Sequence, residues 1–278
     1  MSLILNEHTL GQPIIHSNDR SPANLSDRKS KGTTIRIGDV DLYYEKHGSG
    51  DPLICLHNFS SNARSRFYPL LPVLTEHYTC YLVDLPGHGR SNNPSPLWTH
   101  EQNSRDIIGL LKELRVPSAR FLAASSGGMT MLRVARYAPD LVKAMVIDSA
   151  TYRVPLEARK FYRSPDLLSP RLIRYYKAAN EVLGEDYWRF LAQTFYDFRL
   201  PECDINVPLE TLKDIKAPTL IISGDRDSFF TVDIAIDMKQ TIPTSELLVV
   251  PNTKHIVMEF FPEMVAKRAI DFFERHPA

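Results

Sequence analysis

The sequence has few cysteines and no excess of charge of either sign. Its three cysteines, Cys55, Cys80 and Cys203, are an odd number without the spacing of a metal site, which argues against a disulfide framework and against a metal centre. The 33 basic and 33 acidic residues balance, and Lys and Arg are scattered along the chain. This balance argues against nucleic acid or an anionic membrane surface as a partner.

Long apolar runs are also absent. None approaches the roughly 18 residues of a transmembrane helix, and the run Leu3–Leu5 is too short for the apolar part of a signal peptide. We therefore expect a cytoplasmic protein that acts on a small molecule and needs no membrane, cofactor or metal ion. The 278 residues, of which 43% are hydrophobic, suffice for one or two domains with a sizeable core. Composition leaves open whether the chain forms a homo-oligomer.

Short apolar runs alternate with helical patterns along most of the chain. The strand-like runs are residues 34–37, 42–45, 53–56, 80–83, 121–123, 144–147, 218–223 and 247–250. The helical patterns include residues 64–76, which Pro69 and Pro72 interrupt, and residues 99–114, 232–240 and 262–274. The first two runs predict a hairpin, and the alternation predicts a doubly wound, mostly parallel sheet of the α/β class.

Two segments break this alternation. Residues 1–32 are polar and rich in turn formers, so we interpret them as an N-terminal extension. Residues 153–213 hold helical patterns without a buried strand, and ten of these 61 residues are aromatic, against 27 of 278 in the whole chain. The rings could line an apolar pocket or form the core of a thin helical layer. We expect two to four of them to face a ligand.

A candidate nucleophile lies in residues 119–128, which read Ala-Arg-Phe-Leu-Ala-Ala-Ser-Ser-Gly-Gly. A strand-like run leads into small residues and then into a helical pattern. This layout is typical of a nucleophile elbow, in which a sharp turn exposes a serine hydroxyl beside the N–H groups of a new helix. The same letters also fit a Gly/Ser turn whose serine merely caps the helix.

A candidate acid and a candidate base follow the serine in the order that such a nucleophile requires. Asp227 comes just after the run 218–223, where open α/β sheets place their sites, whereas Asp225 fits a solvated turn better. His255 lies in a short loop between the run 247–250 and a helical pattern. Asp148, after the preceding strand, is the alternative acid.

Five segments in this order resemble the α/β-hydrolase fold, in its group of cap-bearing, cofactor-independent serine hydrolases. They are residues 53–59, residues 84–91, the elbow, residues 224–227, and His255 with Glu259 beyond it. The resemblance implies an eight-stranded, mostly parallel sheet with a helical cap inserted after the sixth strand. It divides the chain into the extension at 1–32, a core at 33–152 and 214–278, and a cap at 153–213.

The resemblance also implies roles for single residues. The sharp turn requires small residues two positions before and two positions after the nucleophile, and both Ser125 and Ser126 satisfy this small-residue rule. The resemblance selects Ser125, because Gly127 and Gly128 then take the family's glycine positions. The backbone N–H groups of Ser126 and Phe59 would then form the oxyanion hole. The usual His-Gly pair is His57-Asn58 here. We expect Asn58 to adopt the positive φ that glycine would take.

The implied reaction is acyl transfer to water, with His255 as base and Asp227 orienting it. Its expected substrate is a small apolar ester, lactone or thioester. We expect five residues to contact it: His57, Asn58, Tyr162, Trp188 and Phe195. Two alternatives stay open. One is C–C bond hydrolysis, or a cofactor-free lyase or cyclase step, in the same site; the other is a non-enzymatic ligand-binding receptor or scaffold on the same fold.

Overall fold

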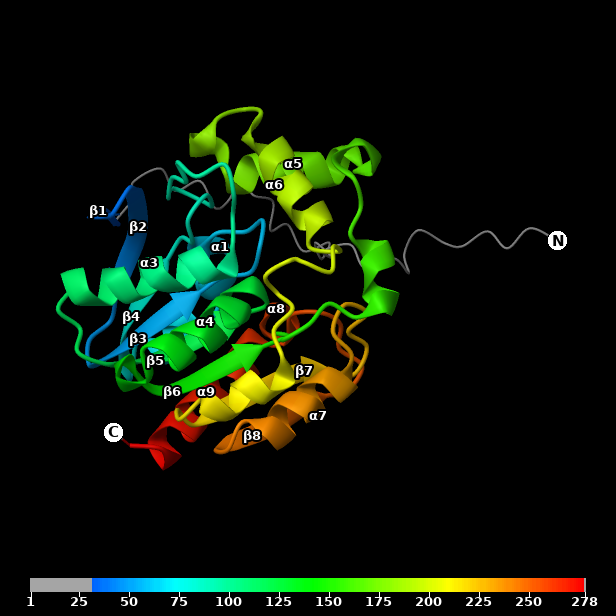
Figure 1. Cartoon of the computed structure of the whole chain (residues 1–278). Helices are drawn as coiled ribbons and strands as arrows, with labels where there is room; N and C mark the ends of the chain where they lie inside the picture. Colours follow the sequence, from blue (N-terminus) through cyan, green and yellow to red (C-terminus); the bar gives the residue numbers. More distant parts are fainter. Residues whose placement is uncertain (1–31, 278) are drawn as a thin grey trace.

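A computed structural model describes residues 32–277, in which eight strands form one sheet (Figure 1). The strand order is β1-β2-β4-β3-β5-β6-β7-β8. Only the β1–β2 and β2–β4 pairs are antiparallel, which confirms the mostly parallel sheet and the hairpin. The strands are β1 Thr33–Ile37, β2 Val40–His47, β3 Asp51–Leu56, β4 Tyr78–Val83, β5 Ala119–Ala124, β6 Val142–Asp148, β7 Thr219–Gly224 and β8 Ser245–Val250. The expected N-terminal extension falls almost wholly outside the described residues.

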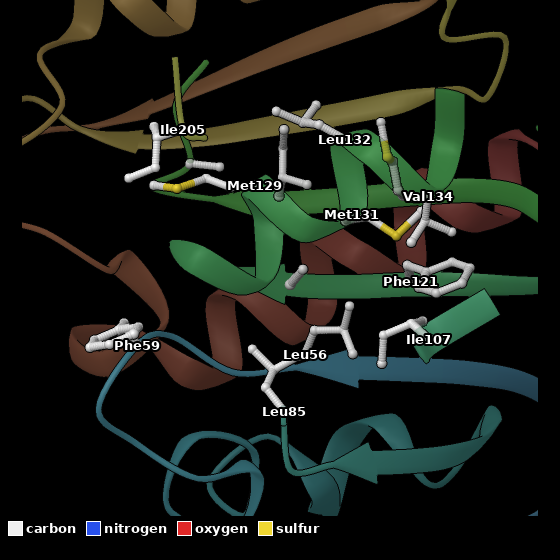
Figure 2. Close-up of a cluster of buried hydrophobic side chains, with 14 of the residues drawn as sticks. Leu56, Phe59, Leu85, Ile107, Phe121, Met129, Met131, Leu132, Val134 and Ile205 are labelled. Carbon is white, nitrogen blue, oxygen red and sulfur yellow. The ribbon is translucent and has the colours of Figure 1, made fainter. Parts of the chain in front are cut away.

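Helices cover both faces of the sheet and bury a separate core on each. Because side chains alternate across a strand, Ile54 and Leu56 of β3 enter one core while Leu53 and Cys55 enter the other. Figure 2 shows part of the first core, between the sheet and two of its helices. That core is covered by α3 His100–Glu113, α4 Ser126–Tyr137 and α7 Val232–Thr241. The second is covered by α1 Ala63–Phe67, α2 Leu71–Leu74, α8 Val257–Phe260 and α9 Pro262–Arg275.

The helix expected over residues 64–76 is two short helices. The first, α1, ends at Phe67, just before Pro69. The second, α2, carries Pro72 in its first turn, where the missing N–H of proline costs nothing. The break turns the chain back toward the second core, which buries Phe67 and Leu74.

Residues 153–213, which we call the cap segment, contain no strand and follow β6 directly. They form α5 Pro170–Ala179 and α6 Tyr187–Asp197, together with short 3-10 turns. The 3-10 turns of the described chain are η3 Pro139–Leu141, η4 Leu156–Phe161, η5 Pro165–Leu167, η6 Glu181–Leu183 and η7 Leu209–Asp214. Figure 1 shows α5 and α6 lying together beyond one edge of the sheet.

Hydrogen bonds fix the cap segment over the carboxyl ends of the parallel strands. The side chain of Asn62, after β3, donates to Ala179 O at 3.1 Å. The N–H of Gly89, after β4, donates to the Asn180 side chain at 2.8 Å. Because open α/β sheets place their sites at this edge, the cap segment covers the region where the candidate residues converge.

Candidate active site

Ser125 occupies a sharp turn between β5 and α4. Its backbone has φ 49° and ψ −115°, a conformation that residues other than glycine rarely adopt. The N–H of Ser125 donates to Asp148 O at 2.8 Å, which ties the turn to the end of β6. The turn is also tight against β3, since a Cβ added at Gly127 would lie 2.7 Å from His57 O. The small residues around Ser125 are therefore a steric requirement of this turn.

A chain of hydrogen bonds runs from Ser125 through His255 to Asp227. Ser125 Oγ lies 3.1 Å from His255 Nε2, and His255 Nδ1 lies 2.7 Å from Asp227 Oδ2. An ionised Asp227 keeps the ring proton on Nδ1, which leaves Nε2 to accept the hydroxyl of Ser125. The three side chains come from loops that are far apart in sequence.

Asp227 is buried and held in place by two further hydrogen bonds. Its other oxygen, Oδ1, accepts from Phe229 N at 2.8 Å and from Phe230 N at 3.0 Å. These donors stabilise the charged carboxylate and fix its plane toward His255. Asp225 is exposed instead and accepts from Thr253 N at 3.1 Å, so it supports the loop that carries His255.

The alternative acid, Asp148, anchors the segment directly after His255. Its two carboxylate oxygens accept from Val257 N at 3.0 Å and from Met258 N at 2.7 Å, in the first turn of α8. Burial raises the pKa of Asp148, although the hydrogen bond from Met258 N opposes the shift. Ser149 adds a bond from Ile256 N to its hydroxyl at 2.9 Å. Asp148 thus positions the His255 loop without bonding to the imidazole.

His57 does not face a ligand site, which corrects the expectation of a substrate contact. Its ring is fully buried, and Leu85 N donates to Nε2 at 2.9 Å. The other ring nitrogen donates to Asn58 O at 2.7 Å. Burial holds the pKa of His57 well below its usual range, so the ring is a neutral support for the loop after β3.

Asn58 does not adopt the positive φ expected of it; the residue of this loop that does is Ser60, with φ 62°. Asn58 uses its side chain instead. The amide oxygen accepts from Arg66 Nε at 2.8 Å, and the amide nitrogen donates to Phe59 O at 3.0 Å. Arg66 in turn bonds Glu259 of α8 at 3.2 Å. The loop that carries Phe59 is therefore clamped to α1 and α8.

The two expected oxyanion donors lie on segments that pack together. Ser126 is the first residue of α4, where helix N–H groups have no carbonyl partner within the helix. Phe59 follows His57, whose carbonyl oxygen lies against Gly127 in the same first turn of α4. The loop that carries Phe59 and the helix start that carries Ser126 are therefore in close backbone contact.

Aromatic rings surround the hydrogen-bonded chain. The His255 ring lies 5.2 Å from the rings of both Phe229 and Phe230. From the cap segment, Tyr162 packs against Phe195 at 4.8 Å and against Phe229 at 5.7 Å. Phe195 also stacks on Phe59 at 5.8 Å, so the rings of Tyr162 and Phe195 pack in the cluster next to His255, and their contact with a substrate stays a prediction.

Trp188 lies apart from this ring cluster. Within residues 32–277 none of the aromatic ring contacts involves it; its buried side chain packs in the first core, with the Arg189 guanidinium 4.7 Å from its ring centre. The same described residues hold no cluster of three or more metal-ligating side chains. They also hold no helix that is long and apolar enough to span a membrane.

Comparison with known proteins agrees with this geometry. The model of the alpha/beta hydrolase family matches residues 47–268. The chain belongs to this family. This hydrolase is 26% identical over 273 residues to the human serine hydrolase BPHL, a match that covers 95% of this chain and 93% of the relative.

Two further matches extend the comparison. The hydrolase is 25% identical to the pimeloyl-[acyl-carrier protein] methyl ester esterase of Nitrosospira multiformis, covering 85% of this chain and 99% of the relative. The solved structure of the meta-cleavage product hydrolase CumD of Pseudomonas fluorescens superimposes with a TM-score of 0.72 at 18% identity. That match covers 88% of this chain and 98% of CumD, and it supports the fold alone.

Several residues of the site have no signal in the sequence. Arg66 meets Glu259 across 193 residues of chain, and of this pair the sequence marked only Glu259, as part of the resemblance. Phe229 and Phe230 look like ordinary apolar loop residues. Only the position of the two phenylalanines, two and three residues after Asp227, could have drawn attention to them. His100 and Asp204, which meet across 104 residues of chain, likewise have no signal in the sequence.

Proposed function

We propose that this hydrolase cleaves a small apolar ester, lactone or thioester through an acyl-enzyme on Ser125. The observation that carries the proposal is the hydrogen-bonded chain Ser125–His255–Asp227 at a strained elbow. Backbone strain is costly, and it persists where the surroundings enforce it, most often at functional sites. A nucleophile, a base within reach of it and a third group orienting the base are the parts that acyl transfer requires.

The proposed reaction starts when His255 Nε2 takes the proton of the Ser125 hydroxyl as Oγ attacks the substrate carbonyl. The C–O π electrons move to the carbonyl oxygen, and a tetrahedral intermediate forms. His255 then gives its proton to the leaving alcohol or thiol, and the acyl-enzyme remains. A water molecule, deprotonated by His255, repeats the attack and releases the acid and Ser125. Asp227 stays ionised throughout and stabilises the imidazolium.

The backbone N–H groups of Phe59 and Ser126 would hold the oxyanion of both tetrahedral intermediates. The loop after β3 and the first turn of α4, which carry these donors, are in close backbone contact, and we expect the donors to need little reorganisation during the reaction. Loss of one such donor typically costs about 10²–10³ in rate. The Arg66–Asn58 clamp supports the loop that carries the first donor.

The ring cluster argues for an apolar substrate. Phe59, Tyr162, Phe195 and Phe229 surround the site, and rings of this kind are typical of pockets for apolar groups. Arg66, which supports the loop of Phe59, forms an ion pair with Glu259, so its charge is balanced. The name of the relative from Nitrosospira multiformis, a methyl ester esterase, agrees with ester chemistry.

The proposal is tested by labelling the protein with a serine-reactive phosphonate, followed by peptide mapping and a panel of aryl esters. We expect one label, on Ser125, and turnover of short aryl esters. Ser125→Ala should abolish both. Ser126→Ala is the matched control, because it removes the neighbouring hydroxyl but keeps the backbone N–H, and it should still accept the label. A label on Ser126 would overturn the assignment, and labelled Ser125 without ester turnover would point to C–C bond hydrolysis.

A further inference from the structure

A second chain of aspartate, histidine and serine lies beneath the elbow. His100 Nδ1 lies 2.9 Å from Asp204 Oδ1, and His100 Nε2 lies 3.2 Å from Ser126 Oγ. Asp204 belongs to the cap segment, His100 is the first residue of α3, and Ser126 is the first residue of α4. His100 is fully buried and Ser126 is 2% exposed, so the hydrogen bond between their side chains is shielded from solvent.

The protons of this chain have one favourable arrangement. Burial lowers the pKa of His100 and keeps the ring neutral near neutral pH. Although burial opposes it, the pKa of Asp204 falls to about 2, because His100 and Arg133 stabilise the charged carboxylate. Nδ1 therefore donates to Asp204, and Nε2 accepts the hydroxyl of Ser126.

Asp204 is itself fixed on three sides. Its second carboxylate oxygen accepts from Glu101 N at 3.0 Å, and Arg133 of α4 donates to its backbone oxygen. Its neighbour Ile205 belongs to the first core, where Figure 2 shows its side chain directed toward Met129 of α4. This part of the cap segment is thus docked on the start of α3 and on α4.

The same contacts reach the loop of Phe59. The His100 ring lies 4.9 Å from Trp98 and 5.4 Å from Phe198 of the cap segment. The Phe59 ring packs on the same two side chains, at 4.9 Å and 5.1 Å. Both residues whose N–H groups would hold the oxyanion therefore contact one cluster, in which Trp98 and Phe198 lie between Phe59 and His100.

We propose that His100 and Asp204 are positioning residues, which fix Ser126 and thereby aim its backbone N–H at the oxyanion. The inference rests on the proposed function. A hydroxyl bound to an immobile ring holds Ser126 in one side-chain rotamer and restrains the peptide between Ser125 and Ser126. Because Asp204 is supplied by the cap segment, docking of that segment completes the oxyanion hole. A misplacement of about 1 Å at such a site can cost on the order of 10²-fold in rate.

The test compares His100→Ala, His100→Gln, Asp204→Asn and Ser126→Ala in the full chain. The measurements are kcat and KM on an aryl ester, the rate of phosphonate labelling, and thermal unfolding. We expect His100→Ala to lower kcat and the labelling rate roughly 10- to 100-fold with KM within about threefold. His100→Gln should recover much of this loss, because its amide can donate to Asp204 and accept from Ser126.

The matched control is Asp197→Asn, which makes the same chemical change elsewhere in the cap segment. Asp197 is half-exposed at the end of α6 and accepts from Gln193 at 2.9 Å, and it takes no part in the hydrogen bonds that join Asp204, His100 and Ser126. It should leave kcat unchanged, whereas Asp204→Asn should lower it. If His100→Ala fails to fold, the milder changes His100→Gln, Asp204→Asn and Ser126→Ala, which remove few atoms, carry the same comparison.

The outcomes separate this inference from the proposed function. Ser125→Ala that keeps both label and turnover would refute the proposed function and this inference with it. A second outcome is that Ser125→Ala loses both while the His100 and Asp204 variants change only KM or the melting temperature. In that case the hydrogen bonds among Asp204, His100 and Ser126 merely hold the cap segment in place. That result would overturn the positioning role alone. A fall in kcat at constant KM, with recovery in His100→Gln, supports it.

Discussion

Replacing Gly127 with alanine perturbs the contact that sets the elbow against the loop after β3. An added Cβ would lie 2.7 Å from the carbonyl oxygen of His57 and nearer still to that of Leu56. Both neighbours are backbone atoms of a central strand and the loop it leads into, so neither can rotate away. The start of α4 and the end of β3 must separate.

The energy of this change has two opposing parts. Alanine gains about 1 kcal/mol over glycine in an open helix. Overpacking costs about 1–3 kcal/mol, and more when rigid groups collide. With backbone on both sides of the contact, we expect a net loss of about 2 kcal/mol in the free energy of unfolding. The separation also moves Phe59 N away from Ser126 N, so kcat should fall by about 10²-fold.

Urea unfolding measures the free energy of unfolding, and aryl-ester turnover measures kcat at a temperature where the variant is folded. Gly128→Ala is the matched control. Its added Cβ would meet the methyl group of Ala150 at 2.6 Å rather than backbone, so it should lower stability yet keep kcat within a few-fold. A Gly127→Ala protein as stable and active as the wild type would refute the reasoning about this contact.

Three further predictions concern the surroundings of the site. His255→Ala should lower kcat by about 10³-fold or more and Asp227→Asn by less, with unchanged circular dichroism; full activity in Asp227→Asn would remove it as the orienting acid. Arg66→Ala frees the Asn58 side chain and should lower kcat more than it raises KM, which steady-state kinetics would check. Burial lowers the pKa of His88 to about 4, so the unfolded chain binds a proton between pH 6.5 and 4 that the folded chain does not. The free energy of unfolding of the wild type therefore falls over that window. Urea unfolding repeated from pH 7 to pH 4 should show that His88→Gln loses up to about 3 kcal/mol less than the wild type.

The sequence by itself determined the features that depend on neighbouring residues. Apolar, β-branched runs separated by helical patterns predicted the sheet, because burial on both faces selects such residues locally. The helical pattern was expected to start at Thr99, a residue type that favours helix N-caps, and its hydroxyl accepts from Gln102 N at 3.1 Å, three residues away. The order of Ser125, Asp227 and His255 was also readable, since each follows a recognisable strand.

Only the tertiary structure decided which side chains meet. Ser125 and Ser126 obey the same small-residue rule, and the packing of distant loops gives the first to His255 and the second to His100. Asn58 was expected to adopt a positive φ, but Arg66, eight residues later in α1, engages its side chain instead. His100 and Asp204 lie 104 residues apart and bond only because the cap segment docks on α3 and α4. Local pattern fixes backbone conformation through short-range sterics, whereas hydrogen-bond partners across the fold are chosen by how the finished layers pack.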